Sequence, residues 1–155
     1  MIYGFAFKNK SSRILYQLPC LDFRWIMFRN NLKYFLRKIE QEKPQYIVGM
    51  GLWSGRGTKL RIETMCRNKF RLRAINPQLS IDHKYIIKPI FIIDEHSVYG
   101  KGMGTSWCNY FSYHIMEFLS SHQLSSRYQF LHIPKKMNGR FAVECISKLL
   151  YQITT

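Results

Sequence analysis

Apolar positions recur along the first third of the chain with two different periods, which predict two strands and one long helix. Residues 2–7 alternate weakly between apolar and polar and suit a first strand. Residues 13–18 form a second predicted strand, which Pro19 ends. Residues 22–42 carry large apolar side chains at helical spacing, so we expect a helix there with Asp22 as its N-cap.

The middle of the chain contains short apolar runs that glycine and proline interrupt. Residues 46–50 form one such run, which is typical of a buried parallel strand. Residues 60–74 alternate in two segments and predict a β-hairpin with its turn near residues 67–69. Pro89 argues against an uninterrupted central strand in the next apolar run, and residues 98–104, rich in glycine, predict a loop.

The last third of the chain alternates helix and strand patterns clearly. Residues 107–121 predict a helix with one apolar face, residues 128–133 a strand ended by a proline, and residues 141–153 a final amphipathic helix. Helices that alternate with short apolar strands favour an α/β protein. We therefore expect a single domain over residues 1–155, folded as a three-layer α/β/α sandwich around a mixed, mostly parallel sheet.

The composition is that of a globular protein without a membrane segment. Hydrophobic residues make up 46% of the chain, which includes ten Tyr and eleven Phe. No apolar run approaches the roughly 20 residues that a helix needs to cross a bilayer. The N-terminus lacks the basic segment and apolar core of a signal peptide, so we expect a cytoplasmic protein that does not bind a membrane.

The chain is strongly basic, with 24 Lys and Arg against nine Asp and Glu and a net charge of +15. Such a charge attracts polyanions, among them nucleic acid. The basic residues are spread over the whole sequence, and the densest stretch, from Arg56 to Arg73, holds seven of them. This charge fits either a solvated basic face or a nucleic-acid site, and no sequence motif decides between the two.

The cysteines are candidates for chemistry, and they stand at positions 20, 66, 108 and 145. They form no CxxC pair and have no metal-type spacing with histidine, so we expect free thiols and neither a metal nor a cofactor. Cys108 differs from the others because it begins a predicted helix after a glycine-rich loop. There the helix dipole and the free backbone N–H groups favour a thiolate and can hold an oxyanion.

His132 is the natural partner for such a cysteine. It ends a predicted strand just before a proline, and sites in α/β proteins lie at the carboxyl ends of strands. A thiol nucleophile needs a base, and the base needs an acid to orient it. The residues by themselves leave a purely structural role open for both Cys108 and His132.

Three segments, in the right order, carry motifs of one peptidase family. Residues 103–109 (MGTSWCN), followed by Tyr113, match a nucleophile segment, and residues 129–134 (QFLHIP) match a histidine segment. Glu63 lies in a segment that runs from a glycine-rich loop to Asn68, as the family's acid does. In these features the chain resembles pyroglutamyl peptidase I (pyrrolidone-carboxylate peptidase), the cysteine peptidases that remove N-terminal pyroglutamate.

The resemblance implies a catalytic triad and a phosphorylase/hydrolase-like version of the three-layer fold. Cys108 would attack the amide carbonyl, His132 would carry its proton to the leaving amine, and Glu63 would orient His132. The product of attack would be a thioester that water hydrolyses. Phe5, in an echo of an N-terminal Gly-Phe motif, and Arg73, after the Glu–Asn pair, would contact substrate. A peptide or small amide is the implied substrate, and the family's tendency to oligomerise implies a homo-oligomer.

The chain also departs from the family. It is shorter, and the segment between Pro89 and Gly104 is too short for the family's helix before the cysteine. Ser106 stands where the family has an aromatic clamp for the pyroglutamyl ring, and Leu52 stands where it has a glutamine. Two hypotheses follow. The first is a cysteine peptidase that cleaves after an N-terminal pyroglutamyl or similar blocked residue. The alternative is a catalytically idle relative that binds nucleic acid or another polyanion.

Overall fold

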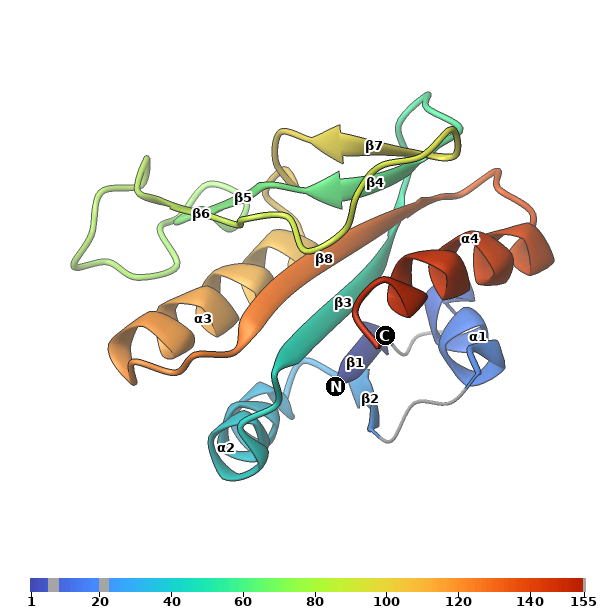
Figure 1. The fold of residues 1–155 in the computed structure, drawn as a ribbon. Coiled ribbons are helices and arrows are strands. Elements are labelled where there is room, and N and C mark those ends of the chain that lie inside the picture. Colours follow the sequence, from blue (N-terminus) through green and yellow to red (C-terminus); the bar gives the residue numbers. More distant parts are fainter. Residues whose placement is uncertain (6–8, 20–22, 155) are drawn as a thin grey trace.

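The computed structural model describes residues 1–5, 9–19 and 23–154, and these form a six-stranded sheet in the order β2-β1-β3-β8-β4-β7 (Figure 1). Strands β1 to β3 and β8 run parallel to one another, whereas β4 pairs antiparallel with β8 and parallel with β7. The strands of this sheet are β1 (Ile2–Phe5), β2 (Arg24–Met27), β3 (Tyr46–Trp53), β4 (Leu60–Glu63), β7 (Ser97–Gly100) and β8 (Arg127–Pro134).

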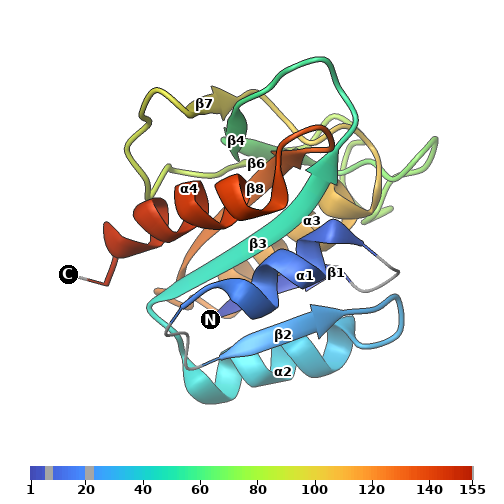
Figure 2. The ribbon, with the colours of Figure 1, turned by 90° about the vertical axis from the view of Figure 1, so that its right-hand side faces the viewer.

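Helices cover both faces of this sheet, and the predicted three-layer architecture is therefore confirmed. Figure 2 shows α1 and α4 in front of the sheet and α3 behind it. Residues from α1 and α4 share one buried cluster with Val48 and Leu131, and residues from α2 and α3 share a second cluster with Ile47 and Phe130. The helices are α1 (Lys10–Gln17), α2 (Leu32–Glu42), α3 (Trp107–Ser121) and α4 (Gly139–Tyr151).

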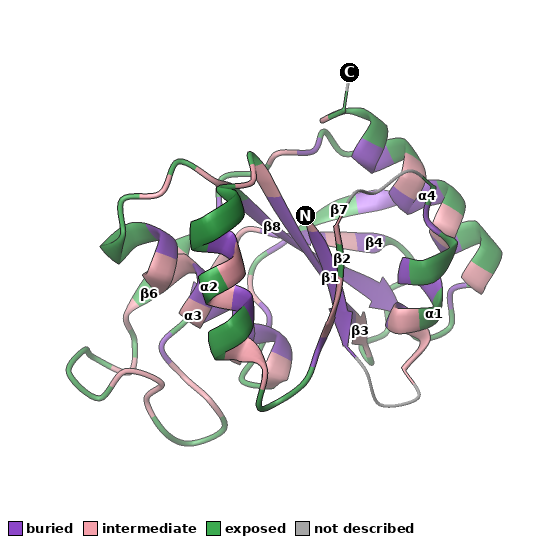
Figure 3. Cartoon of the chain, turned by 90° about the horizontal axis from the view of Figure 1, so that it is seen from below, coloured by how far each residue is buried: buried purple, intermediate pink, exposed green. Residues whose placement is uncertain are grey.

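The centre of the molecule is the pair of long strands β3 and β8. They pair in parallel over their whole length, from Tyr46 opposite Arg127 to Trp53 opposite Pro134. Both strands are buried on both faces along most of their length, whereas each helix carries exposed residues as well as buried ones (Figure 3). Alternation along each strand therefore points successive side chains to opposite layers, and this sets which residues face α3.

The N-terminal third contains two wrong predictions. Residues 13–18, predicted as a strand, lie mostly in helix α1, where the side chain of Asn9 accepts a hydrogen bond from the Ser11 N–H and caps the helix. Residues 22–42, predicted as one helix, are a strand, β2, followed by a turn and α2. Asn31 makes that turn by accepting from the Phe28 N–H and donating to the Ile26 carbonyl. Asp22, the expected cap, lies outside the described residues.

The predicted hairpin over residues 60–74 is also wrong. Strand β4 joins the main sheet, and β5 (Met65–Arg67) pairs antiparallel with the distant β6 (Lys84–Ile86) in a small second sheet. The predicted loop at residues 98–104 begins as β7, because its backbone pairs with β4. Backbone hydrogen bonds between β4 and β7 stabilise this strand, and the glycine content on which the loop prediction rested does not reveal such pairing.

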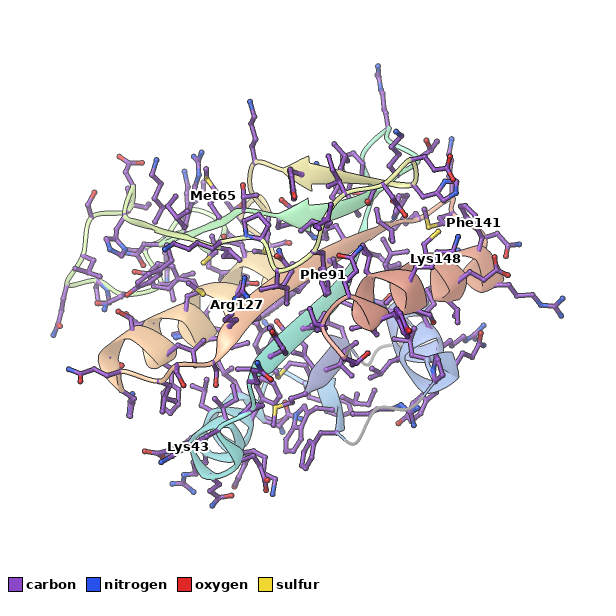
Figure 4. The ribbon with its side chains drawn as sticks, in the orientation of Figure 1. Lys43, Met65, Phe91, Arg127, Phe141 and Lys148 are labelled. Atoms are coloured by element: carbon purple, nitrogen blue, oxygen red, sulfur yellow. The ribbon has the colours of Figure 1, made fainter. Side chains whose placement is uncertain are left out.

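The expected break at Pro89 is confirmed, since β6 ends at Ile86 and no helix occupies the described segment from there to α3. The chain instead crosses the sheet face beside α4, where Phe91 is buried in the same cluster as residues of that helix (Figure 4). Within the described residues, no helix is both long enough and apolar enough to span a membrane.

Candidate active site

The carboxyl end of β8 brings three chemically important strands together. His132 lies opposite Gly51 of β3 on one side and opposite Arg61 of β4 on the other. Glu63 is two residues beyond Arg61, so strand alternation places its side chain on the same face as those of Arg61 and His132. That face is the one that α3 covers, and α3 carries Cys108.

Glu63 and His132 form a buried hydrogen-bonded pair. The ring N–H at Nδ1 of His132 donates to Oε1 of Glu63 at 2.7 Å, and both side chains are almost fully excluded from solvent. The backbone N–H of Gly102 donates to the other carboxylate oxygen at 3.1 Å. Because an ionised carboxylate only accepts, these donors fix the tautomer of His132 and leave its Nε2 as the nitrogen able to take a proton.

Arg61 is a further partner of Glu63 that the sequence motifs do not identify. Its Nε lies 3.1 Å from Oε1 of Glu63, and its guanidinium also donates to the Gly102 carbonyl at 3.3 Å. The same guanidinium stacks on the Trp53 ring at 4.4 Å from the centroid. A buried carboxylate is costly unless a charge and hydrogen bonds compensate it, and Arg61 supplies both. The i, i+2 spacing of two opposite charges on one strand is the signal that points to it.

Gly100 allows this arrangement because it leaves room for the carboxylate. A Cβ at position 100 would lie 2.3 Å from Oε2 of Glu63, far inside van der Waals contact. Strand β7 therefore needs glycine at position 100, the residue that pairs with Glu63 of β4. Because the backbone after β7 passes close to Glu63, the N–H of Gly102 can donate to its carboxylate.

Cys108 is the second residue of α3, and its sulfur packs against strand β3. A Cβ built on Gly51 would be 2.7 Å from the Cys108 sulfur, which places the sulfur beside the residue opposite His132. No hydrogen bond joins the sulfur to the His132 ring among the described residues. Asn109 holds the helix start against the β5 segment, since its side chain bonds the N–H and carbonyl of Arg67 and the carbonyl of Lys69.

The expectation that its helix position makes Cys108 a thiolate is wrong for this structure. Burial raises the pKa of the Cys108 thiol to about 12, and hydrogen bonds with Ser106 and with its own backbone offset only part of that rise. The negative charge of Glu63 acts in the same direction as burial. Loss of hydration thus outweighs the helix terminus, and the resting sulfur is a protonated thiol.

Two hollows meet at the site. One, of about 220 Å³, lies beside Cys108, and its lining includes the aromatic side chains of Phe5, Trp107 and Phe111. The other, of about 460 Å³, opens beside His132 and has a more polar lining that includes Ser54 and Arg71. Leu52 and Ser106 border both hollows. These are the two positions that differ from the family pattern, so the departures lie between the two hollows.

The expected substrate-contacting residues have different placements. Phe5 lines the hollow beside Cys108, as a substrate-binding residue would. Arg73 is exposed, and the arginine that lines the hollow beside His132 is Arg71. Arg71 has a positive φ of 56° and donates its N–H to the Thr105 carbonyl, which ties its loop to the turn before α3. Sequence spacing cannot foresee this backbone conformation, because arginine rarely adopts it.

Solved structures similar to this chain include peptidases. The chain has the fold of the pyroglutamyl peptidases, also described as pyrrolidone carboxyl peptidases, and the resemblance seen in its motifs is confirmed at the level of the fold. No protein-family model and no curated protein matches the sequence. The sequence identities are low, so the likeness to these structures shows a shared fold and no more.

Three of these solved structures show how close the likeness is. Pyroglutamyl peptidase I from Bacillus amyloliquefaciens is 18% identical with a TM-score of 0.78, covering 97% of this chain and 92% of its own. Pyrrolidone carboxyl peptidase from Thermococcus litoralis is 14% identical with a TM-score of 0.74, covering 97% and 90%. A mutant of the Pyrococcus furiosus enzyme is 16% identical with a TM-score of 0.74, covering 97% and 95%.

Proposed function

We propose that this protein is a cysteine peptidase that hydrolyses the amide bond after an N-terminal pyroglutamyl or similar blocked residue. The observation that carries the proposal is the buried Glu63–His132 hydrogen bond of 2.7 Å on the sheet face where Cys108 lies. An acid-oriented imidazole beside a cysteine at a helix start is the arrangement that thiol nucleophiles use. The fold shared with pyroglutamyl peptidases supports the same conclusion.

The protonated state of Cys108 sets the order of events. Because the thiol is neutral at rest, His132 must remove its proton as the sulfur attacks the carbonyl carbon. Glu63 then stabilises the imidazolium that forms. Among the described residues no hydrogen bond joins the Cys108 sulfur to the His132 ring, and catalytic hydrogen bonds of this kind often tighten only in the complex with substrate.

The two hollows separate the two halves of the substrate. The imidazolium returns its proton to the leaving amine, and the amine therefore departs through the hollow that His132 lines. The acyl half stays on Cys108 as a thioester in the aromatic hollow beside it. The N–H groups of the first turn of α3, which lack partners within the helix, would stabilise the carbonyl oxygen that becomes negative during attack.

Hydrolysis of a chromogenic pyroglutamyl amide tests the proposal. We expect activity in the wild-type chain, none in Cys108→Ala, and nearly full activity in Cys66→Ala, which also removes one buried thiol. Iodoacetamide should modify Cys108 ahead of Cys66 and Cys145, because Cys108 lines a hollow and is 9% exposed, against 0% and 2% for the other two. Mass spectrometry of the peptides will show this order. Inactivity toward every blocked amide, together with equal labelling of these thiols, would contradict the proposal. Salt-sensitive binding to a polyanion would then favour the idle-relative hypothesis.

A further inference from the structure

We propose that Arg29 makes the hollow beside Cys108 selective for an acyl group that ends in a carboxylate. This inference rests on the proposed function and narrows its substrate: the blocking group would be a dicarboxylic half-amide such as a succinyl or glutaryl residue. The far carboxylate would meet Arg29 while the near carbonyl meets the Cys108 sulfur. Arg29 is a specificity-determining residue in this proposal and takes no part in bond cleavage.

The first observation is the place of Arg29. It lines the same hollow as Cys108, and its guanidinium lies 4.4 Å from the centroid of the Trp107 ring. Trp107 directly precedes Cys108, so this stacking holds the cation at the rim of the acyl site. The turn that carries Arg29 is fixed as well, because Asn31 bonds the Phe28 N–H and the Ile26 carbonyl at 2.8 Å each.

The second observation is the charge of the lining. Among the described residues, Arg29 is the one charged member of the lining, and no acidic side chain of that part of the chain lies within ion-pair distance of it. A guanidinium presents only donors, and a carboxylate presents only acceptors. The guanidinium of Arg29 is therefore available to a ligand, whereas that of Arg61 is already paired with Glu63.

The third observation is a second donor at the same site. Asn9 also lines the hollow, and its side-chain oxygen Oδ1 already accepts from the Ser11 N–H at 3.1 Å. That bond leaves the amide NH₂ of Asn9 as the group able to face a ligand, and it donates. Arg29 and Asn9 together suit an anionic oxygen, while Phe5, Leu52 and Phe111 suit the methylene chain that leads to it.

Matched coumarylamides provide the test, since a terminal carboxylate and a terminal carboxamide differ in charge but hardly in size. We expect wild-type protein to hydrolyse succinyl or glutaryl coumarylamide with about tenfold higher kcat/KM than the analogue that ends in a carboxamide. Arg29→Gln should reduce this preference to within about twofold, and Arg29→Lys should retain part of it. Salt should weaken the preference in the wild-type chain.

A matched control is Arg140→Gln, which removes the same charge from an exposed position at the start of α4, on the other face of the sheet. It should leave the preference unchanged. Equal rates for the charged and neutral acyl groups, with hydrolysis of pyroglutamyl coumarylamide intact, would overturn the role of Arg29 and leave the proposed function standing. A preference that survives Arg29→Gln would overturn it as well.

A lack of hydrolysis of every amide would contradict the proposed function. Even then, binding of a carboxylate ligand beside Cys108 can be tested. Glutaramate, which carries one carboxylate, should slow the labelling of Cys108 by iodoacetamide in wild-type protein and in Arg140→Gln. The neutral glutaramide should protect about tenfold less well, and Arg29→Gln should remove the difference. Equal protection by the two compounds would overturn the inference independently of catalysis.

Discussion

The sulfur of Cys108 occupies the space that a side chain on Gly51 would fill. A Cβ at position 51 would lie 2.7 Å from that sulfur and 2.9 Å from Cζ of Phe130. Gly51 is directly opposite His132 in the sheet, so the missing side chain is what lets the helix bring the thiol down beside the imidazole. Glycine is required here because of space, since its φ is not among the positive ones.

Gly51→Ala should therefore lower activity severely. The added methyl group would push the Cys108 sulfur away from His132, and displacement of reacting groups by about 1 Å can cost roughly a hundredfold in rate. We expect at least that loss in kcat/KM for a blocked amide, with a melting temperature lowered by overpacking. Gly139→Ala is the control, because its Cβ would meet only Lys10 Cε at 3.8 Å. A Gly51→Ala variant with normal activity would show that the thiol does not need this position.

Glu63→Gln should disable the imidazole while leaving Cys108 in place. A neutral amide cannot stabilise the imidazolium, and its NH₂ group cannot accept from the His132 ring. General acid–base catalysis contributes about 10²–10⁴-fold, so kcat/KM should fall by at least a hundredfold. Glu117→Gln alters another hydrogen-bonded acid, on α3 away from the site, and should have little effect on rate. Comparable losses in the two variants would argue for a structural role of Glu63.

Arg61→Met should reduce stability because it leaves the carboxylate of Glu63 buried without its cation. Glu63 is fully buried and Arg61 about one-fifth exposed, so the loss is that of a largely desolvated pair. We expect the free energy of unfolding to fall by about 2 kcal/mol, measured in urea. Arg127→Met removes an arginine whose guanidinium lies over Tyr46 and donates to the Pro89 carbonyl, so its cost should stay under about 1 kcal/mol. Equal costs would mean that the ion pair adds nothing.

Alkaline pH should destabilise the protein through its buried thiols. Burial raises the pKa of Cys66 from its usual 9 to about 12, as it does for Cys108. A thiol that ionises more easily when unfolded stabilises the fold fully below pH 9 and loses that contribution as the pH rises toward 12. Between pH 9 and 10, Cys66→Ala should therefore lose stability with pH less steeply than wild type, by up to about 1.4 kcal/mol per pH unit. Parallel curves from denaturant titrations would contradict this.

The sequence predicted well those elements that carry a strong pattern of their own. Helix α3 begins and ends where the apolar spacing of residues 107–121 indicated, and β8 and α4 differ from their predictions by one or two residues. The motifs around Glu63 and His132 led to two residues that the fold brings into hydrogen-bond contact across 69 positions of sequence. Glu63 and His132 meet because β4 and β8 are neighbouring strands of the sheet.

The failures occurred where tertiary contacts decide the structure. Strand β2 is only four residues long and lies at the sheet edge, so pairing with β1 outweighed the helical spacing of its apolar residues. The apolar residues Ile14 and Leu15 of α1, with Leu18 at its C-cap, fit a short helix, but Pro19 made the run look like a strand. The partnership of Arg61 with Glu63 was also missed, because no family motif places an arginine there.

The acid and the base of the proposed triad stand on the sheet, and the nucleophile stands on a helix. Strands β4 and β8 are hydrogen-bonded to each other, so Glu63 and His132 keep their spacing as long as the sheet persists. Cys108 is carried by a helix that packs on that sheet through side chains. A small slide of α3 would separate sulfur from imidazole without disturbing the carboxylate. Core substitutions under this helix would thus give evolution a graded way to tune or abolish the proposed activity while every motif residue is retained.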